Sequence, residues 1–420
     1  MVRVGRFTAS AVPSTMLVLT VATSATAQPW GAPLRGPEFE AVRSVTVVGQ
    51  NEPLYVQPGL KPKRRGAAVQ HSRLPVYAAR QAEGCDGPWL MVGPLAWICS
   101  RRVETSPLPP YPAAPGSTFP NGLPYRYHFA GEFGTFGYRD LATAERGIPD
   151  AEIEPGFALA VERIKEPYPG DPFGLTTKGV WVPMRDLYPA RGSLFQGTEL
   201  DGELDVAWVY EEGADVYASP GGRRVSGDAH PRFANLKVLE TKELWGRRWF
   251  RIGDDQWVSD RQVRSPSPAS VPVSVRPGER WIDVDIANQV LTAYEGQRPV
   301  FATMVSTGRG RGDTVQATPK GEHRIWAKLS SSDMDNLENE EASRYYAIQD
   351  VPWVMYFDRG YGLHGTFWHR SFGHVRSHGC VNLAPLDAQR LFYWTSPPIP
   401  TGWSAVLPTD YDPGTVVRVR

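Results

Sequence analysis

The sequence predicts a mostly β protein of several domains, on three observations. A chain of 420 residues is longer than one hydrophobic core usually supports, so several cores are expected. The chain holds 39 Pro and 41 Gly, which favours short strands joined by turns. Apolar residues mostly alternate with polar ones, and helical spacing is rare. We expect small β-barrel-like repeats, followed by a β-rich C-terminal domain with one or two short helices.

Charge is balanced, with 45 Lys and Arg against 45 Asp and Glu. A chain without a net field has no general attraction for nucleic acid, so no nucleic-acid partner is expected. Binding must then come from local sites.

The first 27 residues predict a secretory signal peptide. Arg3 and Arg6 precede an apolar run at 12–22, and small residues end at Ala27, where we expect cleavage. The run is shorter than the roughly 20 apolar residues that span a bilayer, and no later segment is long and apolar enough. We therefore expect an exported protein of the periplasm or cell envelope, with no stable membrane span after signal removal.

Three cysteines in an oxidising compartment leave one over. Cys85 and Cys99 are 14 residues apart and flank an apolar stretch. They can form a disulfide, which would be worth about 3 kcal/mol in the chain-entropy model, or remain two buried thiols. In both cases Cys380 is the odd cysteine, and an odd thiol in an exported protein needs a reason.

Tryptophans mark an internal repeat in the first two thirds of the chain. The segments WLMVGPLAW (89–97) and WFRIGDDQW (249–257) share an eight-residue step, and FGLTTKGVW (173–181) is a weaker copy. Short alternating spans around them predict small barrels, in which core packing is the usual role of tryptophan. The repeats resemble bacterial Src-homology-3-like domains. That resemblance implies envelope targeting or cell-wall binding.

Pro-rich segments separate the predicted parts, because such composition favours extended spacers. The predicted division is a signal peptide at 1–27, a first Src-homology-3-like module at 43–106, a Pro-rich linker at 107–124, a weaker middle β module at 125–200, a second Src-homology-3-like module at 204–264, a second Pro-rich linker at 265–279, a larger β domain that contains Cys380 at 280–408 and a C-terminal tail at 409–420.

From Trp281 the pattern becomes that of one larger β domain. Ile282, Val284 and Ile286 alternate with polar residues, and the turns that follow are typical of a β-meander. Residues 384–395 have apolar side chains near helical spacing, which predicts a helix there.

The chemistry of an odd thiol depends on its neighbours. A cysteine attacks carbonyls as its thiolate, so we expect a base or positive group to lower the pKa of Cys380 from about 8.5. His378 lies two residues before it, and His364 can reach it only if the chain between them folds back. Gly379 lets backbone amides approach a reacting carbonyl, and Ser377 adds a hydroxyl. This pattern favours acyl transfer.

Three other roles of the thiol compete with acyl transfer. His364, His369, His374 and His378 could form a metal cluster with Cys380, although the spacing is not that of a zinc site. A buried structural cysteine is the second alternative, and a redox thiol the third, although no second cysteine lies near enough in sequence to resolve a disulfide.

The segment HGTFWHRSFGHVRSHGCVNL, 364–383, is similar to the signature of the L,D-transpeptidase catalytic domain. The upstream segments TPKGEHRIW and IDVDIANQVLTAYEG also fit the opening strands of that family. The resemblance covers about 281–407. It implies a mostly β domain that acts on peptidoglycan stem peptides as donor and acceptor, and it implies no metal or cofactor.

In that family a cysteine cleaves the bond after the third residue of a tetrapeptide stem, commonly meso-diaminopimelate, and releases D-alanine. A thioester forms, and an amine of a second stem attacks it to give a cross-link. The resemblance gives Cys380 the nucleophile's place, His364 that of the general base and the Gly365 carbonyl that of the partner orienting the imidazole. His378 and Gly379 fall where the family shapes the oxyanion and substrate pocket.

The resemblance is less specific for substrate recognition. Ser377 belongs to the Ser-His-Gly-Cys core. Asn382 stands where many relatives have Arg and some have Asn, so the substrate carboxylate falls to Asn382, to Arg376 or to another residue. His369 and His374 receive no role and are interpreted as loop residues.

The resemblance predicts a transferase of peptidoglycan biosynthesis and cell wall organization, and so of cell shape, but other functions stay open. The acceptor can be water, which makes an L,D-carboxypeptidase, or a protein amine. The acidic, polar segment at 330–346 predicts a mobile flap on which that choice depends. A function of another class is a wall-binding scaffold whose catalytic domain is inactive.

Overall fold

The computed structural model describes residues 42–112, 119–166, 170–310, 312, 314, 316–337 and 346–420. The predicted signal peptide at 1–27 lies outside this range. The described residues contain 34 strands and two α-helices, which confirms a mostly β chain with short helices. No helix in the described part combines the length and the apolar character needed to cross a membrane.

The first module is a pair of curled sheets. A three-stranded sheet has the order β4-β1-β8, and β5-β6-β7-β2-β3 form the second. The strand bounds are β1 (Ser44–Val47), β2 (Glu52–Tyr55), β3 (Arg64–Ala68), β4 (Arg73–Leu74), β5 (Ala78–Arg80), β6 (Trp89–Gly93), β7 (Ala96–Cys99) and β8 (Val103–Ser106), with a 3-10 turn at Ser100–Arg102.

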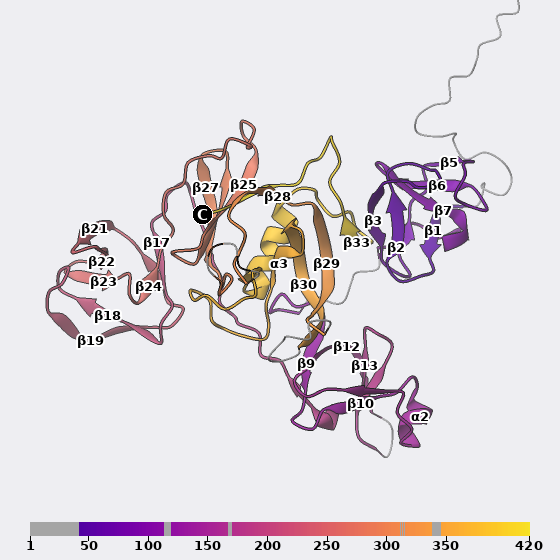
Figure 1. The fold of residues 1–420 in the computed structure, drawn as a ribbon, viewed down its shortest axis with the longest axis horizontal. Helices are drawn as coiled ribbons and strands as arrows, with labels where there is room; N and C mark the ends of the chain where they lie inside the picture. Colours follow the sequence, from indigo (N-terminus) through magenta and orange to yellow (C-terminus); the bar gives the residue numbers. More distant parts are fainter. Residues whose placement is uncertain are drawn as a thin grey trace, which may run out of the picture.

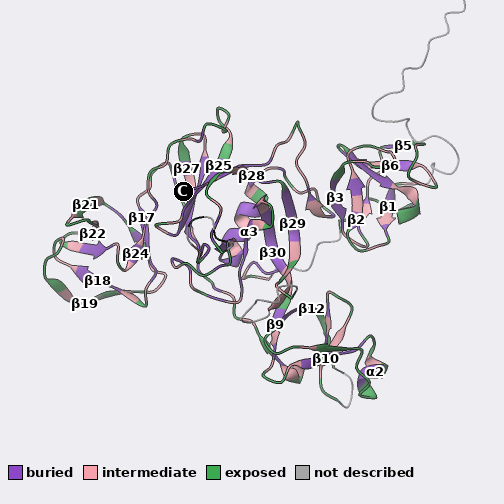
Figure 2. Cartoon of the chain, viewed as in Figure 1, coloured by how far each residue is buried: buried purple, intermediate pink, exposed green. Residues whose placement is uncertain are grey.

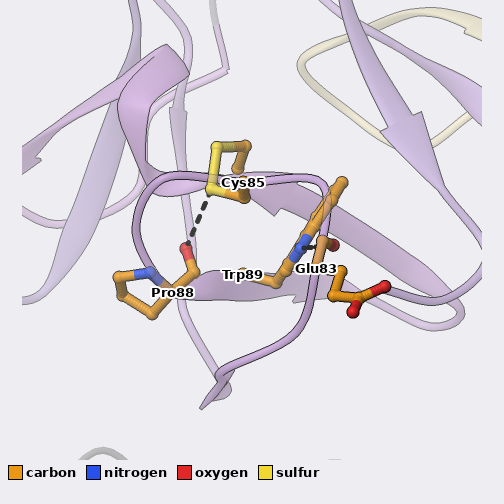
Figure 3. Close-up of a disulfide and its surroundings, with 5 residues drawn as sticks. Glu83, Cys85, Pro88 and Trp89 are labelled. Atoms are coloured by element: carbon orange, nitrogen blue, oxygen red, sulfur yellow. Dashed lines mark hydrogen bonds between the residues drawn. A yellow bond between two sulfur atoms is a disulfide. The ribbon is translucent and has the colours of Figure 1, made fainter. Parts of the chain in front are cut away.

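Cys85 and Cys99 form a disulfide in this module, with Cα atoms 5.6 Å apart (Figure 3). The bond ties the loop after β5 to the end of β7. Beside it, the indole N–H of Trp89 donates to the Glu83 carbonyl oxygen at 3.1 Å.

The middle module is built on an antiparallel sheet with β9 and β12 at its centre. Its elements are β9 (Arg126–Ala130), β10 (Thr135–Gly137), α2 (Leu141–Glu145), β11 (Ala151–Ile153), β12 (Ala158–Lys165), β13 (Phe173–Thr176), β14 (Trp181–Pro183), a 3-10 turn at Met184–Asp186, and β15 (Leu187–Pro189). Asp140 begins α2 by accepting a hydrogen bond from the Thr143 amide at 2.7 Å, as a good N-cap does.

The third module has a three-stranded sheet, β20-β17-β24, and a five-stranded sheet, β19-β18-β23-β22-β21. The tryptophans of the two clearer repeats, Trp89, Trp97, Trp249 and Trp257, are all buried, as core packing predicts. The strand bounds are β17 (Val206–Val209), β18 (Gly213–Tyr217), β19 (Arg224–Pro231), β20 (Asn235–Lys237), β21 (Glu240–Leu244), β22 (Arg247–Gly253), β23 (Gln256–Ser259) and β24 (Val263–Arg264).

The domain predicted to be catalytic, called the catalytic domain below, lies at the centre of the molecule and packs α3 against two sheets (Figure 1). Its elements are β25 (Arg280–Asp285), β26 (Val290–Glu295), β27 (Arg298–Met304), β28 (Gly321–Arg324), β29 (Ala327–Asp335), β30 (Ala347–Asp358), β31 (Tyr361–Gly365), β32 (Val381–Leu383), α3 (Pro385–Trp394), β33 (Trp403–Val406) and β34 (Val416–Val419). The helix predicted at 384–395 is α3. Figure 2 shows buried residues gathered around α3 and β30.

The six-stranded sheet of this domain includes two strands from outside the predicted range 280–408. Its order is β16-β27-β26-β25-β34-β28, and β16 (Thr198–Glu199) comes from the connection before the third module. The segment predicted as a C-terminal tail, 409–420, contains β34, which pairs in parallel with β25. The end of the chain is therefore a strand of the catalytic domain.

Two strand pairings join the other modules to the catalytic domain. In the first module, β3 pairs with β33, with Ala67 opposite Ala405. In the middle module, β12 meets β30 in parallel through Ala158 and Ile348. Residues 338–345 of the predicted flap lie outside the described part, and the described residues on either side belong to the β29–β30 hairpin.

Candidate active site

The backbone brings two distant segments of the sequence to one place. Strands β31 and β32 are parallel neighbours, with His364 opposite Asn382. Cys380 directly precedes β32, and a hydrogen bond from the Gly362 amide to its sulfur fixes it against the start of β31. The chain between His364 and Cys380 therefore folds back, as the prediction for His364 required.

A cavity of about 290 Å³ opens at this point. Of the predicted site residues, six line it: Cys380, His364, His378, Ser377, Arg376 and Asn382. The two predicted glycines, Gly365 and Gly379, lie beside lining residues and do not line it themselves. Six lining residues have no predicted role: Arg309, Met334, Tyr346, Ile348, Trp368 and His369.

His364 is a buried, oriented imidazole. Its Nδ1 lies 3.2 Å from the Gly365 carbonyl oxygen, so Nδ1 carries the proton and Nε2 keeps a free lone pair. Trp368 stacks on the imidazole, with ring centres 5.7 Å apart and planes at 24°. Burial lowers the pKa of His364 to about 4, although the Gly365 hydrogen bond opposes this. The imidazole is therefore uncharged at neutral pH.

Cys380 is a thiol at rest. Burial raises its pKa, and the hydrogen bond from the Gly362 amide offsets only part of the rise. The expected lowering of this pKa is wrong, because the imidazole is neutral at rest. An arrangement of thiol and neutral imidazole can still react, if the base removes the proton as the sulfur attacks.

A tight turn over 377–380 presents the thiol. The Ser377 hydroxyl donates to the Cys380 carbonyl oxygen and accepts from the Gly379 amide, the latter at 3.0 Å. Gly379 has φ +122°, and a Cβ there would lie 2.3 Å from the ring of Tyr361. Glycine is required at this position by both conformation and space. The Ser377 hydroxyl stabilises the turn, and its role toward substrate stays a prediction.

His369, interpreted from sequence as a loop residue, is buried and holds Asn382 in place. Its Nδ1 accepts from the Ser371 amide at 3.1 Å, so its Nε2 must carry the proton. The Asn382 Nδ2 lies 2.8 Å from His369 Nε2. Two N–H groups cannot bond to each other, so a protonated Nε2 requires the Asn382 amide to be turned over, with its oxygen toward the ring. Burial, aided by Arg376 and His364, lowers the pKa of His369 to about 3 and keeps it neutral.

Positive charge lies at the rim of the cavity. Arg309 and Arg376 are both exposed lining residues, and Arg309 Nε donates to the Arg376 carbonyl oxygen at 2.8 Å. Two guanidinium groups at one mouth suit a carboxylate ligand. Arg309 lies 71 residues before Cys380 in the chain, and no local pattern in the sequence marks it.

His378 does not have the buried, oriented environment of His364. It is exposed and stacks on Tyr346, with ring centres 5.7 Å apart. Burial and the nearby Arg309 lower its pKa. Among the described residues, no group of three His, Cys, Asp or Glu is arranged to hold a metal ion, so the metal-cluster alternative gains no support.

Residues 279–419 match the model of the YkuD family, the L,D-transpeptidase catalytic domain. This part of the chain is a YkuD domain. No curated protein matches the sequence. Among solved structures, this chain is similar to an L,D-transpeptidase from Xylanimonas cellulosilytica. The two are 22% identical over 36% of this chain and 65% of that one, with a TM-score of 0.24.

Two further structures are of the same kind. A mutant L,D-transpeptidase from Enterococcus faecium is 23% identical over 34% of this chain and 50% of its own, at a TM-score of 0.26. An L,D-transpeptidase from Mycobacterium smegmatis is 15% identical over 56% and 89%, at 0.25. The chain thus spans about half to two thirds of the first two proteins. At these TM-scores the similarities say nothing about the role of any residue.

Proposed function

We propose that the protein is an exported cysteine acyltransferase that cross-links peptidoglycan stems through a thioester at Cys380. The observation that carries the proposal is the placing of Cys380 and His364 in one cavity of a YkuD domain, with the imidazole oriented by the Gly365 carbonyl. The donor is a tetrapeptide stem, and its last residue, D-alanine, leaves.

The first half of the reaction forms the thioester. His364 Nε2 takes the thiol proton as the Cys380 sulfur adds to the carbonyl carbon of the third residue. Because the Gly379 amide already donates to the Ser377 hydroxyl, other backbone amides of this turn stabilise the oxyanion. The bond to D-alanine then breaks, and the imidazolium returns its proton to the leaving amine.

The second half repeats these steps with an amine as nucleophile. The side-chain amine of another stem attacks the thioester carbonyl and His364 takes a proton from that amine. The carbon–sulfur bond then breaks, and the imidazolium returns the proton to the sulfur, which leaves as a thiol. The product is an amide between two third residues, and the enzyme returns to its starting state. Arg309 and Arg376 at the rim attract carboxylates of the stems, and Asn382, held by His369, orients a backbone amide.

The test is acylation of the full mature chain by a carbapenem, a reagent class that acylates this family. Intact mass should rise by one equivalent of reagent, and peptide mapping should place it on Cys380. A Cys380→Ala variant is the matched control and should stay unmodified. A wild-type protein that folds but gains no mass would overturn the proposal and would favour an inactive catalytic domain on a wall-binding scaffold.

The acceptor is decided by a second measurement. Tetrapeptide stems are incubated with the protein, with and without an acceptor stem, and products are read by mass spectrometry. We expect a dimer together with free D-alanine. Tripeptide alone, in the presence of acceptor, would mean that water is the acceptor and that the protein is an L,D-carboxypeptidase.

A further inference from the structure

A second cavity, of about 400 Å³, lies where the first module, the middle module and the catalytic domain meet. The strand pairs β3–β33, β29–β33 and β12–β30 frame it. We call it the junction cavity. The reaction proposed at Cys380 uses none of its residues.

Polar side chains that donate hydrogen bonds and others that accept them line the junction cavity. The first module supplies amides at Gln50 and Gln70, the catalytic domain a hydroxyl at Ser331, and the middle module the Tyr125 ring and the Glu162 carboxylate. Amides, hydroxyls and carboxylates together match a ligand that both donates and accepts at many points. An apolar ligand would leave these groups unpaired, at a cost for each of them.

The charges of the junction cavity argue against an anion. Glu162, Asp350 and Lys178 all line it, and the Lys178 ammonium is already paired with Asp333 at 2.8 Å and with Asp350 at 3.5 Å. Two carboxylates facing one space repel phosphate or carboxylate ligands. A neutral molecule rich in hydroxyl groups fits this lining, to which Tyr125 adds a half-buried aromatic side chain.

Part of the hydrogen-bonding capacity of the junction cavity is unused. The hydroxyl oxygen of Ser404 is buried and has no hydrogen-bond partner, and Glu162 makes no hydrogen bond or ion pair within the described part of the chain. Asp350 is held instead, by Thr177 and Ser331 hydroxyls that each donate at 2.6 Å. The wall is thus fixed, while acceptors remain free for a ligand.

The two cavities share the β29–β30 hairpin. Ile348 lines the Cys380 cavity, and Asp350, two residues further along β30, lines the junction cavity. Figure 1 shows β29 and β30 side by side, with β12 of the middle module at their end. Both cavities therefore border the same hairpin.

We propose that the junction cavity binds sugar units of the wall glycan strand whose stem peptide occupies the Cys380 cavity. The inference rests on the proposed function and deepens it, because the donor is then a glycan-borne stem. Once the sugar is bound, the tethered stem reaches the thiol at a raised effective concentration.

The test measures binding to the full mature chain carrying Cys380→Ala, which prevents turnover. Neutral oligosaccharides of N-acetylglucosamine, which carry sugar units of the glycan without the carboxylates that removal of the stems would leave, are titrated into the protein by isothermal calorimetry. We expect binding that weakens at least fivefold with Glu162→Gln and with Tyr125→Leu. The control is Glu152→Gln, which changes an exposed carboxylate on β11 of the same module outside the cavity and should leave the affinity unchanged.

Folding is checked by urea unfolding of each variant, and the isosteric Glu162→Gln keeps the test decisive if Tyr125→Leu is unstable. Glycan that binds all variants equally would overturn the location, and glycan that does not bind would overturn the inference. Acylation of wild-type Cys380 by a carbapenem is independent of either result. It separates failure of this inference from failure of the proposed function.

Discussion

At the scale of single residues, the site consists of an uncharged imidazole, His364, and an uncharged thiol, Cys380. Burial lowers the pKa of His364 to about 4 and raises that of Cys380, so each group is uncharged near pH 7. Reactivity then depends on transfer of the proton during attack and not on a standing thiolate. The two ionisations can be separated with two reagents.

Carbapenem acylation and iodoacetamide alkylation should therefore differ in pH dependence. Alkylation needs thiolate, and since the pKa of Cys380 is raised, its rate should stay low at pH 7 and climb above pH 9. Acylation needs neutral imidazole, which is present above its pKa, so its rate should hold from pH 8 down to about pH 5 and fall as pH nears 4. Both rates are read by intact mass. An acylation rate that already falls near pH 6.5 would contradict the lowered pKa of His364.

Removing the base tests its role directly. His364→Ala should slow carbapenem acylation about 10²- to 10⁴-fold, the usual contribution of a general base, and leave non-covalent affinity for the stem nearly unchanged. His374→Ala is a matched control from the same connecting segment, because His374 does not line the cavity. Acylation is stopped at successive times and read by intact mass. Equal acylation rates for the two variants would show that another group takes the thiol proton.

At the scale of elements, the turn before β32 and the strand β31 act together. The turn is closed by the Ser377 hydroxyl, and Gly379 packs its α-carbon against Tyr361 of β31. The turn that carries Cys380 therefore leaves no room for a side chain at Gly379. A small change here should reach both stability and chemistry.

Gly379→Ala should destabilise the protein by about 1–3 kcal/mol, because φ +122° strains a residue with a Cβ and the new carbon would meet the Tyr361 ring. Gly360→Ala is the control, since a Cβ at Gly360 meets nothing within 4 Å and its φ is not left-handed. Urea unfolding measures both. A Gly379→Ala variant as stable as Gly360→Ala would show that the turn relaxes without cost.

At the scale of the whole molecule, the modules are joined to the catalytic domain by packing as well as by strands. Tyr127 of the middle module stacks on Phe367, with ring centres 3.9 Å apart, and its hydroxyl donates to the Asp350 carbonyl oxygen. Phe367 packs edge-to-face on Trp368, which stacks on His364. A continuous series of ring contacts thus connects the core of the middle module to the imidazole of His364.

Tyr127→Ala should cost about 3–5 kcal/mol in unfolding free energy, as removal of a buried aromatic does, and should also slow acylation of Cys380. The control Tyr188→Ala changes an exposed tyrosine of the same module and should do neither. Urea unfolding and acylation rates are compared for the two. Acylation at the wild-type rate in folded Tyr127→Ala would show that the middle module does not position His364.

The sequence by itself determined what depends on local pattern. Alternation and turn residues predicted a mostly β chain, helical spacing predicted α3, and the run from Ser377 to Cys380 with His364 upstream predicted the chemistry. These features are carried by residues close in the chain, or by residue types whose reactivity needs little context.

Only the tertiary structure decided the contacts between distant residues and the charge states that follow from them. Arg309 joins the cavity by lying beside Arg376, and His369 fixes Asn382 from within a loop. Strand β34 pairs with β25 although 130 residues separate their nearest ends. Register across such distances is set by the packing of whole sheets, and the pKa of a thiol or an imidazole is set by how deeply that packing buries it.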